Sequence, residues 1–467
     1  MTTITENQIN ENNQNRIIEG FFKRYRIGQA LKKANAYKSK GIPIVQVMLY
    51  LVQLVFTKKS MYMNILNGTH HAGFAKDVVY RLLNATFINW STFLLQVATS
   101  VIAHIASLTD ESRLNALIID DTMFERLRSK HVELLAKVHD HAAKGGNKFK
   151  RGFRLLTLGW SDGGTFIPLL FRHLSSGDKK SRYKEANPNI DKRSVGHKTR
   201  QQAVSSATEV LLSMLGQAKR MCVPAKHVLF DSWFSFPSTM MRIRKVGFDA
   251  VGRLKDTSKI KYLADGTKKT LKQIYSSNKK RSGRAKYLLS VEVMLYNDKD
   301  ETLPARIVFV RDRNNRNKWI AFGTTDMNLS EEQVIQLYSR RWDIEVFFKI
   351  CKSYLNLGRE FQGLSYDSMT AHTAIVMIRY IILATQKRQN EDPRSLGELF
   401  HLTYDEMADI QFSDAMTIIF GLLRNVLDEC MFLSDKQVNE IIDRFIDKLS
   451  DCFKRSFDHF TPRKLIA

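Results

Sequence analysis

The chain has 467 residues, of which 44% are hydrophobic and 25% are charged. This composition excludes a fibrous or wholly disordered protein and is typical of a globular chain long enough for several domains. Lysine and arginine outnumber the acidic residues by 72 to 47, and the formal net charge is +25. So strong a positive charge favours a polyanionic partner, most simply nucleic acid, although ribosome-associated and membrane-surface proteins share such a balance.

The sequence has no feature of a secreted or membrane protein. Residues 1–15 are polar and lack the apolar stretch of a signal peptide, so we interpret them as a disordered arm. The longest apolar runs, 44–56 and 374–383, are too short or carry charge, and we expect no membrane span. The cysteines lack CxxC spacing, which indicates reduced, buried thiols in a cytosolic protein rather than a zinc site or disulfides. They are Cys222, Cys351, Cys430 and Cys452.

The first hundred residues have a helical pattern. Apolar residues recur at helical spacing over 16–107, with breaks at glycine and proline, and predict four or five helices. Residues 74–84 follow a short turn and carry Lys76, Tyr80 and Arg81 among apolar positions. This segment is either the recognition helix of a helix-turn-helix or an ordinary amphipathic helix with solvated basic residues.

A strand pattern begins after residue 114. The β-branched run ALIIDD ends in Asp120 and Asp121 and predicts a buried strand. Two apolar runs, FRLLTLGW and TFIPLLFRHL, then flank a Ser-Asp-Gly-Gly sequence, which predicts a hairpin with Asp162 in its turn. The strand and the hairpin are therefore expected to form one sheet.

The next segments complete an α/β pattern. The loop 175–198 is rich in lysine and arginine and is a candidate for a contact with DNA. A predicted helix at 199–221 leads to HVLFDSWF, a predicted strand that ends in Asp231. The strands, the hairpin and this helix together indicate an α/β core.

Downstream of Asp256 the apolar residues alternate with polar ones, so that the period of the apolar pattern is two. The runs KYLLSVEVMLY, ARIVFVRD and KWIAFGTT, separated by basic turns, predict a β-rich insertion up to Asn328. After residue 360 the pattern is helical again, with amphipathic stretches at 369–386, 414–430 and 435–453.

Residues 330–356 predict one uninterrupted helix that begins with a capping box at Ser330 and Gln333. Four side chains of this helix fall within an arc of about 60° around its axis: a phenol, a guanidinium, a carboxylate and an ammonium. The four residues are Tyr338, Arg341, Glu345 and Lys352. The simpler interpretation of the charges alone is a ladder at i, i+4 spacing that solvates one helix face.

The spacing Y-x2-R-x3-E-x6-K on this helix resembles the Y-R-E-K signature of the DDE transposases in the IS-four family of bacterial insertion sequences. The resemblance implies an α/β fold with a ribonuclease-H-like catalytic core and a β-rich insertion, flanked by helical regions. The implied boundaries are 1–108 for an N-terminal helical DNA-binding region, 109–254 for the first part of the core, 255–330 for the insertion, 331–360 for the catalytic helix, and 361–467 for a C-terminal region that serves synapsis or dimerisation.

The same resemblance implies a catalytic set of Asp121, Asp231 and Glu345. Carboxylates suit Mg²⁺ or Mn²⁺, and two such ions can activate the attacking oxygen of a phosphodiester reaction and stabilise the leaving one. Because the family aspartate usually precedes a threonine, the sequence favours Asp121 over Asp120, although the choice stays open.

Four residues of the helix are expected, by resemblance, to contact DNA. Tyr338, Arg341 and Lys352 would hold phosphates at the transposon end, and Trp342 would stack on a flipped base. The alternative for Trp342 is a core anchor. A separate His139-Asp140-His141 cluster is interpreted as loop residues rather than a metal site.

The function implied is a cut-and-paste transposase that cleaves insertion-sequence ends and transfers 3′-hydroxyls into target DNA. It would act in the bacterial cytoplasm, at the nucleoid, as a homodimer on terminal inverted repeats. Two alternatives remain at this stage: a non-catalytic DNA-binding protein derived from a transposase, and a structure-selective metal nuclease.

Overall fold

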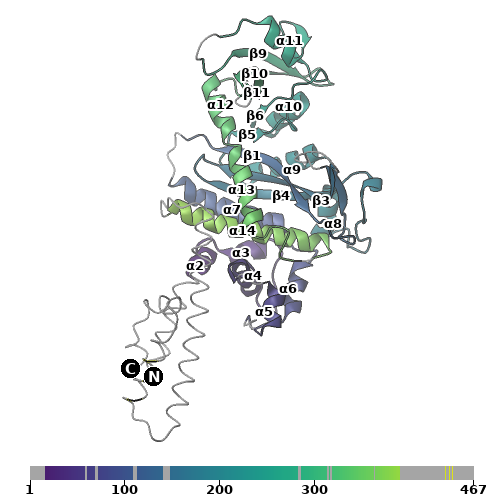
Figure 1. The fold of residues 1–467 in the computed structure, drawn as a ribbon, viewed down its shortest axis with the longest axis vertical. Coiled ribbons are helices and arrows are strands. Elements are labelled where there is room, and N and C mark those ends of the chain that lie inside the picture. Colours follow the sequence, from purple (N-terminus) through teal and green to yellow (C-terminus); the bar gives the residue numbers. More distant parts are fainter. Residues whose placement is uncertain are drawn as a thin grey trace.

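The structure, a computed structural model, places a ribonuclease-H-like core between a group of helices and a β-rich region (Figure 1). It describes residues 16–57, 60–68, 72–108, 113–139, 148–281, 285–312, 315, 318–361 and 363–389, together with the single residues 437, 441 and 444. The predicted helix at 414–430 lies outside the described residues, and of the one predicted at 435–453 the structure describes only the helical residues 437, 441 and 444.

The N-terminal region is helical, as the sequence predicts. It contains more and shorter helices than expected, because breaks such as the one at Arg26 divide the pattern: α2 (Arg16–Arg24), α3 (Ile27–Lys33), α4 (Ile44–Gln53), the 3₁₀ turn η1 (Leu54–Thr57), α5 (Met61–Leu66), α6 (Lys76–Leu83) and α7 (Trp90–Ala106). The predicted segment around α6 exposes Lys76, Tyr80 and Arg81. Helix α7 is largely buried and packs against the core.

The core sheet has the strand order β4-β3-β1-β5-β6. Its strands are β1 (Ala116–Glu125), β3 (Phe149–Ser161), β4 (Phe166–Leu174), β5 (His227–Phe230) and β6 (Asp249–Arg253), and the short β2 (Ala136–His139) extends the edge at β3. Strand β3 lies antiparallel to both of its neighbours, β1 and β4, whereas β5 lies parallel to β1 and β6 parallel to β5. Three antiparallel strands followed by two parallel ones form a ribonuclease-H-like sheet, which confirms the predicted fold class.

Helices α8 (Val195–Ala203), α9 (Ala207–Arg220) and α10 (Pro237–Val246) accompany this sheet. The prediction of one helix at 199–221 is therefore wrong, because α8 and α9 divide this segment. The chain leaves the helix after Val204, and the Ser206 hydroxyl accepts from the backbone N–H of Glu209 to start a new one. Asp162 lies in the β3–β4 turn, as predicted, and accepts from the backbone N–H groups of Gly164 and Thr165.

The β-rich insertion extends the core sheet instead of forming a sheet of its own. It comprises β7 (Tyr262–Ala264), β8 (Thr267–Lys269), α11 (Leu271–Ser277), β9 (Leu289–Tyr296), β10 (Thr302–Arg311) and β11 (Trp319–Thr324). Strand β11 pairs antiparallel with β6, and the order continues through β10, β9, β7 and β8. The insertion and the catalytic core are thus joined by backbone hydrogen bonds.

The predicted long helix is divided into α12 (Glu331–Ser339) and α13 (Trp342–Ser353). Its capping box at Ser330 is confirmed. At the junction the N–H groups of Arg340 and Arg341 donate to carbonyls three residues back rather than four. This tighter turn changes the rotation between the two halves, so the uninterrupted helix that the sequence predicts is corrected here.

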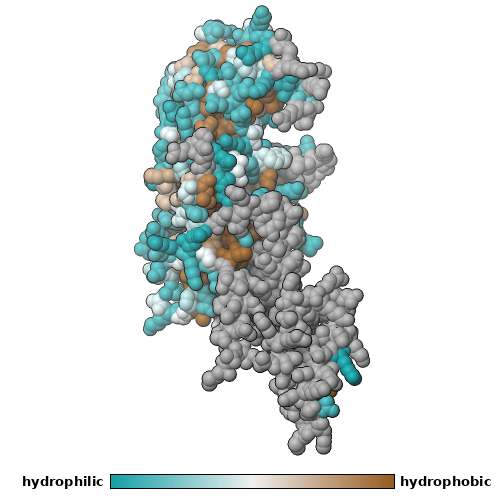
Figure 2. Space-filling model, turned by 90° about the vertical axis from the view of Figure 1, so that its left-hand side faces the viewer, coloured by the Kyte–Doolittle hydropathy of each residue, from teal (hydrophilic) through white to brown (hydrophobic). Residues whose placement is uncertain are grey.

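Helix α14 (Tyr366–Gln389) confirms the helix predicted at 369–386 and runs through the interior. Within the described part of the chain it alone is long and apolar enough to cross a membrane, and its apolar window is entirely buried inside the fold. Its buried Arg379 pairs with Glu360 at 2.9 Å. Figure 2 shows that the described surface is mostly hydrophilic, with scattered hydrophobic patches.

One expectation about the cysteines is wrong. Cys351 is buried and free, as predicted, whereas Cys222 is free but exposed. Cys222 follows the end of α9 with a positive φ of 51°, in a turn that directs the chain out of the helix.

Candidate active site

Two acidic side chains meet where β1 and β5 lie side by side. Ile118 of β1 pairs with Leu229 of β5, and the same register continued by two residues places Asp120 beside Asp231. Paired residues of neighbouring strands project from the same face, and the next residue projects from the other. Asp120 and Asp231 therefore share a face, and Asp121 begins on the opposite one.

Helix α13 brings Glu345 to the Asp120 face through an arginine. The Arg341 Nη1 donates to Asp120 Oδ2 at 2.7 Å, and its Nη2 donates to Glu345 Oε1. Further along α13, Lys352 Nζ donates to Thr122 Oγ1 at 2.7 Å. Thr122 lies two residues beyond Asp120 on the same face of β1.

The hydrogen bonds and nearby cations of this face do not offset the cost of burying its charged carboxylates. Burial raises the pKa of Asp120 to about 7, and neither Arg341 nor the backbone N–H of Asp121 offsets it. Burial also raises the pKa of Asp231, although the N–H of Trp233 donates to its Oδ1 at 2.9 Å. Each group is destabilised as an anion, which is the state that added positive charge would favour.

Asp121 has a different environment. The Arg154 Nε donates to Asp121 Oδ2 at 2.7 Å, and the Nη2 of the same guanidinium contacts the other oxygen. Asp121 is close enough to Asp231 to raise its pKa, but its own charge is already paired with a fork of donors. Asp120 thus shares the face of Asp231, whereas Asp121 is paired with Arg154 and also acts on Asp231. The preference for Asp121 that the sequence gives stays a prediction.

The aromatic residues around the site differ in how far they are exposed. Tyr338 packs on Phe322 with ring centroids 4.5 Å apart, and burial raises its pKa. Trp342 is 63% exposed, so the alternative of a core anchor is wrong. Trp233 is also exposed, and sequence reasoning missed it although it follows Asp231 by two residues in the same DSWF motif.

Contacts to β3, to β4 and to the segment before β1 hold the start of α13 in place. The Ser161 Oγ donates to Asp343 Oδ2 at 2.7 Å. Arg340 donates to the carbonyl of Leu114, and Phe347 packs on Phe166 at 5.1 Å between ring centroids. The position of Glu345 therefore depends on the core sheet.

A second acidic cluster lies at the other end of β5. His227, Asp249 and Asp326 are all buried, and their potential metal-binding atoms lie within 4.8 Å of one another. No other such group occurs among the described residues. At the candidate active site, Arg341 contacts both Asp120 and Glu345. In the cluster, however, Asp326 Oδ2 already contacts His227 Nε2 at 2.8 Å and Lys226 Nζ at 2.7 Å.

The predicted His139-Asp140-His141 cluster is only partly visible. His139 ends β2, and the other two residues lie outside the described part of the chain.

The strand order and the acidic face define a ribonuclease-H-like α/β protein with a carboxylate-rich candidate site. A family model described as DDE superfamily endonuclease matches residues 47–305, more than half of the chain, and the protein belongs to this family. The matched segment includes Asp120, Asp121 and Asp231 and ends before Glu345.

Among curated proteins, the chain is similar to a probable transposase for insertion sequence element IS5377 of Geobacillus stearothermophilus, with 34% identity over 89 residues. The match covers 18% of this chain and 23% of that protein, so the chain spans about a quarter of the length of this relative.

Among solved structures, the Drosophila P element transposase strand transfer complex matches over 84% of this chain and 89% of that chain, with 10% identity and a TM-score of 0.22. A similarity this low carries no argument about the fold or the function.

Proposed function

We propose that the protein is a DNA transposase of an insertion sequence, which cleaves the ends of its element and transfers the freed 3′-hydroxyls into target DNA. One observation supports the proposal: the Arg341 guanidinium joins Asp120 of β1 to Glu345 of α13, and the register of β1 against β5 puts Asp231 beside Asp120. The family membership and the similarity to a probable transposase support it.

The residues present fit a divalent metal site. Burial raises the pKa of Asp120 and of Asp231, and a guanidinium stands between Asp120 and Glu345 as the local cation. We propose that these three carboxylates hold Mg²⁺ or Mn²⁺, in two ions, with hard oxygen ligands. Such ions, when bound, supply Lewis-acid stabilisation of phosphate and a more acidic attacking hydroxyl or water.

The cationic side chains of α13 would position the DNA. Lys352 is held toward the acidic face by Thr122, and Arg341 already lies against Asp120. We propose that both side chains, together with Tyr338, contact phosphates of the DNA backbone near the carboxylates. The exposed Trp342 is proposed to stack on a base at the element end.

The finer assignment is to the IS-four family. The Y-R-E-K spacing supports the assignment, and in the structure Arg341 contacts Glu345 while Lys352 contacts Thr122. We further propose the N-terminal helices as a DNA-binding region and residues 361–467 as a region for synapsis of a homodimer. The protein would act on terminal inverted repeats at the bacterial nucleoid, without a membrane partner.

The experiment incubates the purified protein with DNA that carries the sequences flanking its own gene, in Mg²⁺, Mn²⁺ or EDTA. We expect metal-dependent breaks at inverted repeats, which are absent in the Glu345→Gln protein. Tight binding without any cleavage would favour a non-catalytic DNA-binding protein. Cleavage of branched DNA with no preference for the repeats would favour a structure-selective nuclease.

A further inference from the structure

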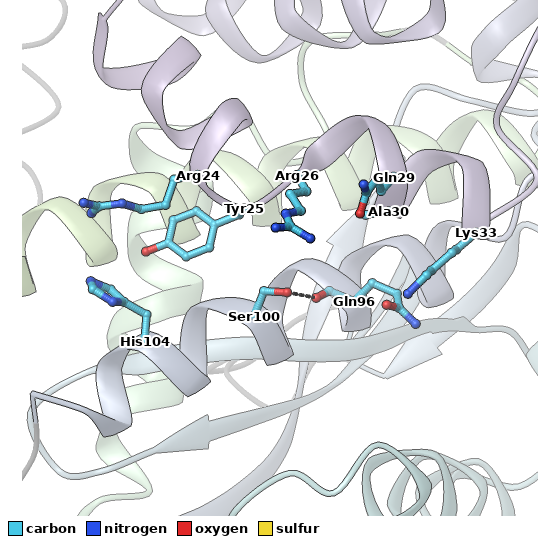
Figure 3. A pocket seen from close by; sticks show the side chains of 9 residues that line it. All are labelled: Arg24, Tyr25, Arg26, Gln29, Ala30, Lys33, Gln96, Ser100 and His104. Atoms are coloured by element: carbon cyan, nitrogen blue, oxygen red, sulfur yellow. Dashed lines mark hydrogen bonds between the residues drawn. The ribbon is translucent and has the colours of Figure 1, made fainter.

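Two places outside the candidate active site bring cationic side chains together. One is the hollow between α2, α3 and α7, whose lining includes Arg24, Arg26 and Lys33 (Figure 3). It belongs to the helical region that we already propose to bind DNA. The other is the turn between β3 and β4, which begins with Asp162 and has guanidinium groups from three distant segments around it. The proposed chemistry gives this turn no role.

The carboxylate of Asp162 has both local and distant partners. The side chain is buried, and its Oδ1 accepts from the backbone N–H groups of Gly164 at 2.9 Å and Thr165 at 2.7 Å, which closes the turn. Its Oδ2 accepts from Arg388 Nη2 at 3.1 Å and lies 3.9 Å from Arg113 Nη1. The turn itself requires only the first oxygen. The second oxygen connects the turn to the end of α14 and to the segment before β1.

The same turn holds the start of α13. Ser161 is fully buried, and its Oγ donates to Asp343 Oδ2 at 2.7 Å and accepts from the backbone N–H of Gly163 at 2.9 Å. The guanidinium of Arg340 lies over Gly163, where an added Cβ would come within 3.0 Å of its Cζ. Arg340 and Asp343 stand at the α12–α13 junction and in the first turn of α13, which also carries Glu345.

The charges around the turn act on one another. Burial raises the pKa of Asp343, and Asp162 raises it further, whereas Ser161 and Arg340 lower it. Burial lowers the pKa of Arg340, and Asp162 and Asp343 act against this shift. The Asp162 charge therefore reaches both charged side chains by which the junction and α13 contact the core.

Helix α14 is connected to α13 in two ways. The rings of Tyr380 and Phe347 pack directly, with centroids 4.7 Å apart. Near the end of α14, Arg388 provides a second connection, because it donates to Asp162 in the turn that holds α13. A displacement of the end of α14 would reach the turn through this ion pair and α13 through the turn. Such a chain of contacts is the physical requirement for coupling between two parts of a fold.

We propose that Asp162 is a positioning residue for Glu345, and that Arg388 couples it to the C-terminal region that follows α14. Asp162 acts on α13 through Ser161 and Arg340, so that Glu345 is held at the site only while the turn is fixed. The inference rests on the proposed function, because that function assigns Glu345 to the catalytic set. It adds that the state of the C-terminal region controls the active site through the β3–β4 turn.

The first test follows hydrogen exchange in the full chain by mass spectrometry, without DNA or metal. Arg388→Gln is compared with Lys387→Gln, which removes the same charge one residue earlier. We expect the backbone N–H groups of 342–353 to exchange about tenfold faster in Arg388→Gln and at the original rate in Lys387→Gln, with residues 116–119 of β1 unchanged in both. Unchanged exchange in 342–353, an equal rise in both variants, or an equal rise in β1 would overturn the proposal.

The second test measures the rate of DNA cleavage at saturating DNA in Asp162→Asn, Arg388→Gln and the double variant. Asn keeps an oxygen for the N–H groups of the turn and removes only the charge. We expect each single variant to slow cleavage by roughly tenfold to a hundredfold with DNA affinity unchanged, and the double variant to be no slower than the slower single variant. Losses that multiply in the double variant would contradict the coupling. A wild type that cleaves no DNA would refute the proposed function, and the exchange rates would still decide whether Asp162 and Arg388 hold α13.

Discussion

Two regions of the molecule combine carboxylates with arginine, and they differ in how well the charges are compensated. In the interior, Arg200 donates to Glu133 at 2.6 Å and to Asp367 at 2.6 Å. Glu133 also accepts from the backbone N–H groups of Asn187 at 2.6 Å and Tyr366 at 2.9 Å. Burial alone would raise the pKa of Glu133, but these hydrogen bonds outweigh it and the pKa is lowered.

The candidate active site has the opposite balance. Arg341 is shared between Asp120 and Glu345, and burial raises the pKa of Asp120 to about 7. A saturated network of donors is what a buried structural ion pair requires. A partly exposed group in which one guanidinium serves two carboxylates is suited to receive a further cation. The two regions differ at Glu133 and Asp120, whereas burial raises the pKa of Asp367 in the interior network as it does that of Asp120.

The largest effect is expected from Asp120→Asn. The loss of one carboxylate from the Asp231 face should reduce DNA cleavage by about a thousandfold or more, the scale seen when an essential catalytic group is removed. Asp121→Asn should reduce it by about tenfold or less, because Asp121 is paired with Arg154. The cleavage rates of both variants, with DNA affinity as a control, show which of the two aspartates belongs to the catalytic set. A loss in Asp121→Asn that equals or exceeds the loss in Asp120→Asn would restore the assignment drawn from the sequence.

The interior network should respond in stability. Arg200→Met leaves the buried Glu133 and Asp367 without their shared cation and should lower the free energy of unfolding by about 3 to 5 kcal/mol. Urea unfolding measures the change. Arg341→Met, at the partly exposed site, is the matched control and should cost about 1 kcal/mol or less. Equal losses in the two variants would remove the distinction between the regions.

Low pH should reduce the free energy of unfolding through the buried His372. Burial lowers the pKa of this histidine to about 3, so the folded protein keeps it neutral. In the unfolded chain the histidine has a pKa of about 6.5, so neutral His372 contributes fully to the free energy of unfolding above that pH. As the pH falls toward 3, this contribution decreases by about 1.4 kcal/mol per pH unit. The stability advantage of the wild type over His372→Gln should therefore narrow below pH 6.5. An advantage that stays constant from pH 7 to pH 5 would show that His372 is not held neutral.

The smallest effect concerns Arg341 as a competitor for cations. Removal of this charge in Arg341→Gln should raise the Mn²⁺ affinity of the DNA-free protein by about fivefold to tenfold, which corresponds to about 1 kcal/mol. Arg154→Gln, which frees Asp121 instead, should leave the affinity unchanged. Isothermal titration calorimetry measures both. Weaker Mn²⁺ binding in Arg341→Gln would mean that the arginine organises the carboxylates rather than competing for them.

Local patterns in the sequence predicted a good part of this structure. The strand that contains Asp120, the hairpin with Asp162 in its turn and the capping box at Ser330 all depend on residues close together in the chain. The strand runs on to Glu125, beyond the end that the sequence predicts. The alternation and the helical spacing identified the α/β core and the insertion for the same reason.

The remaining features depend on contacts between distant segments. The choice between Asp120 and Asp121 requires the register of β1 against β5, and the pairing of Asp121 with Arg154 requires the register against β3. The joining of β11 to β6 and the turn between α12 and α13 likewise follow from packing rather than from local propensity. None of these contacts leaves a periodic signal in the sequence.

The most direct test of this account is Mn²⁺ binding to the wild type, Asp120→Asn, Asp231→Asn and His227→Ala. We expect the two aspartate variants to lose binding and His227→Ala to retain it. In the cluster at His227 each carboxylate has a cation of its own, Lys226 for Asp326 and Arg244 for Asp249, whereas Asp120 and Glu345 share the single guanidinium of Arg341. Binding that survives in the aspartate variants and disappears in His227→Ala would place the metal at the opposite end of β5 and contradict the assignment of the active site.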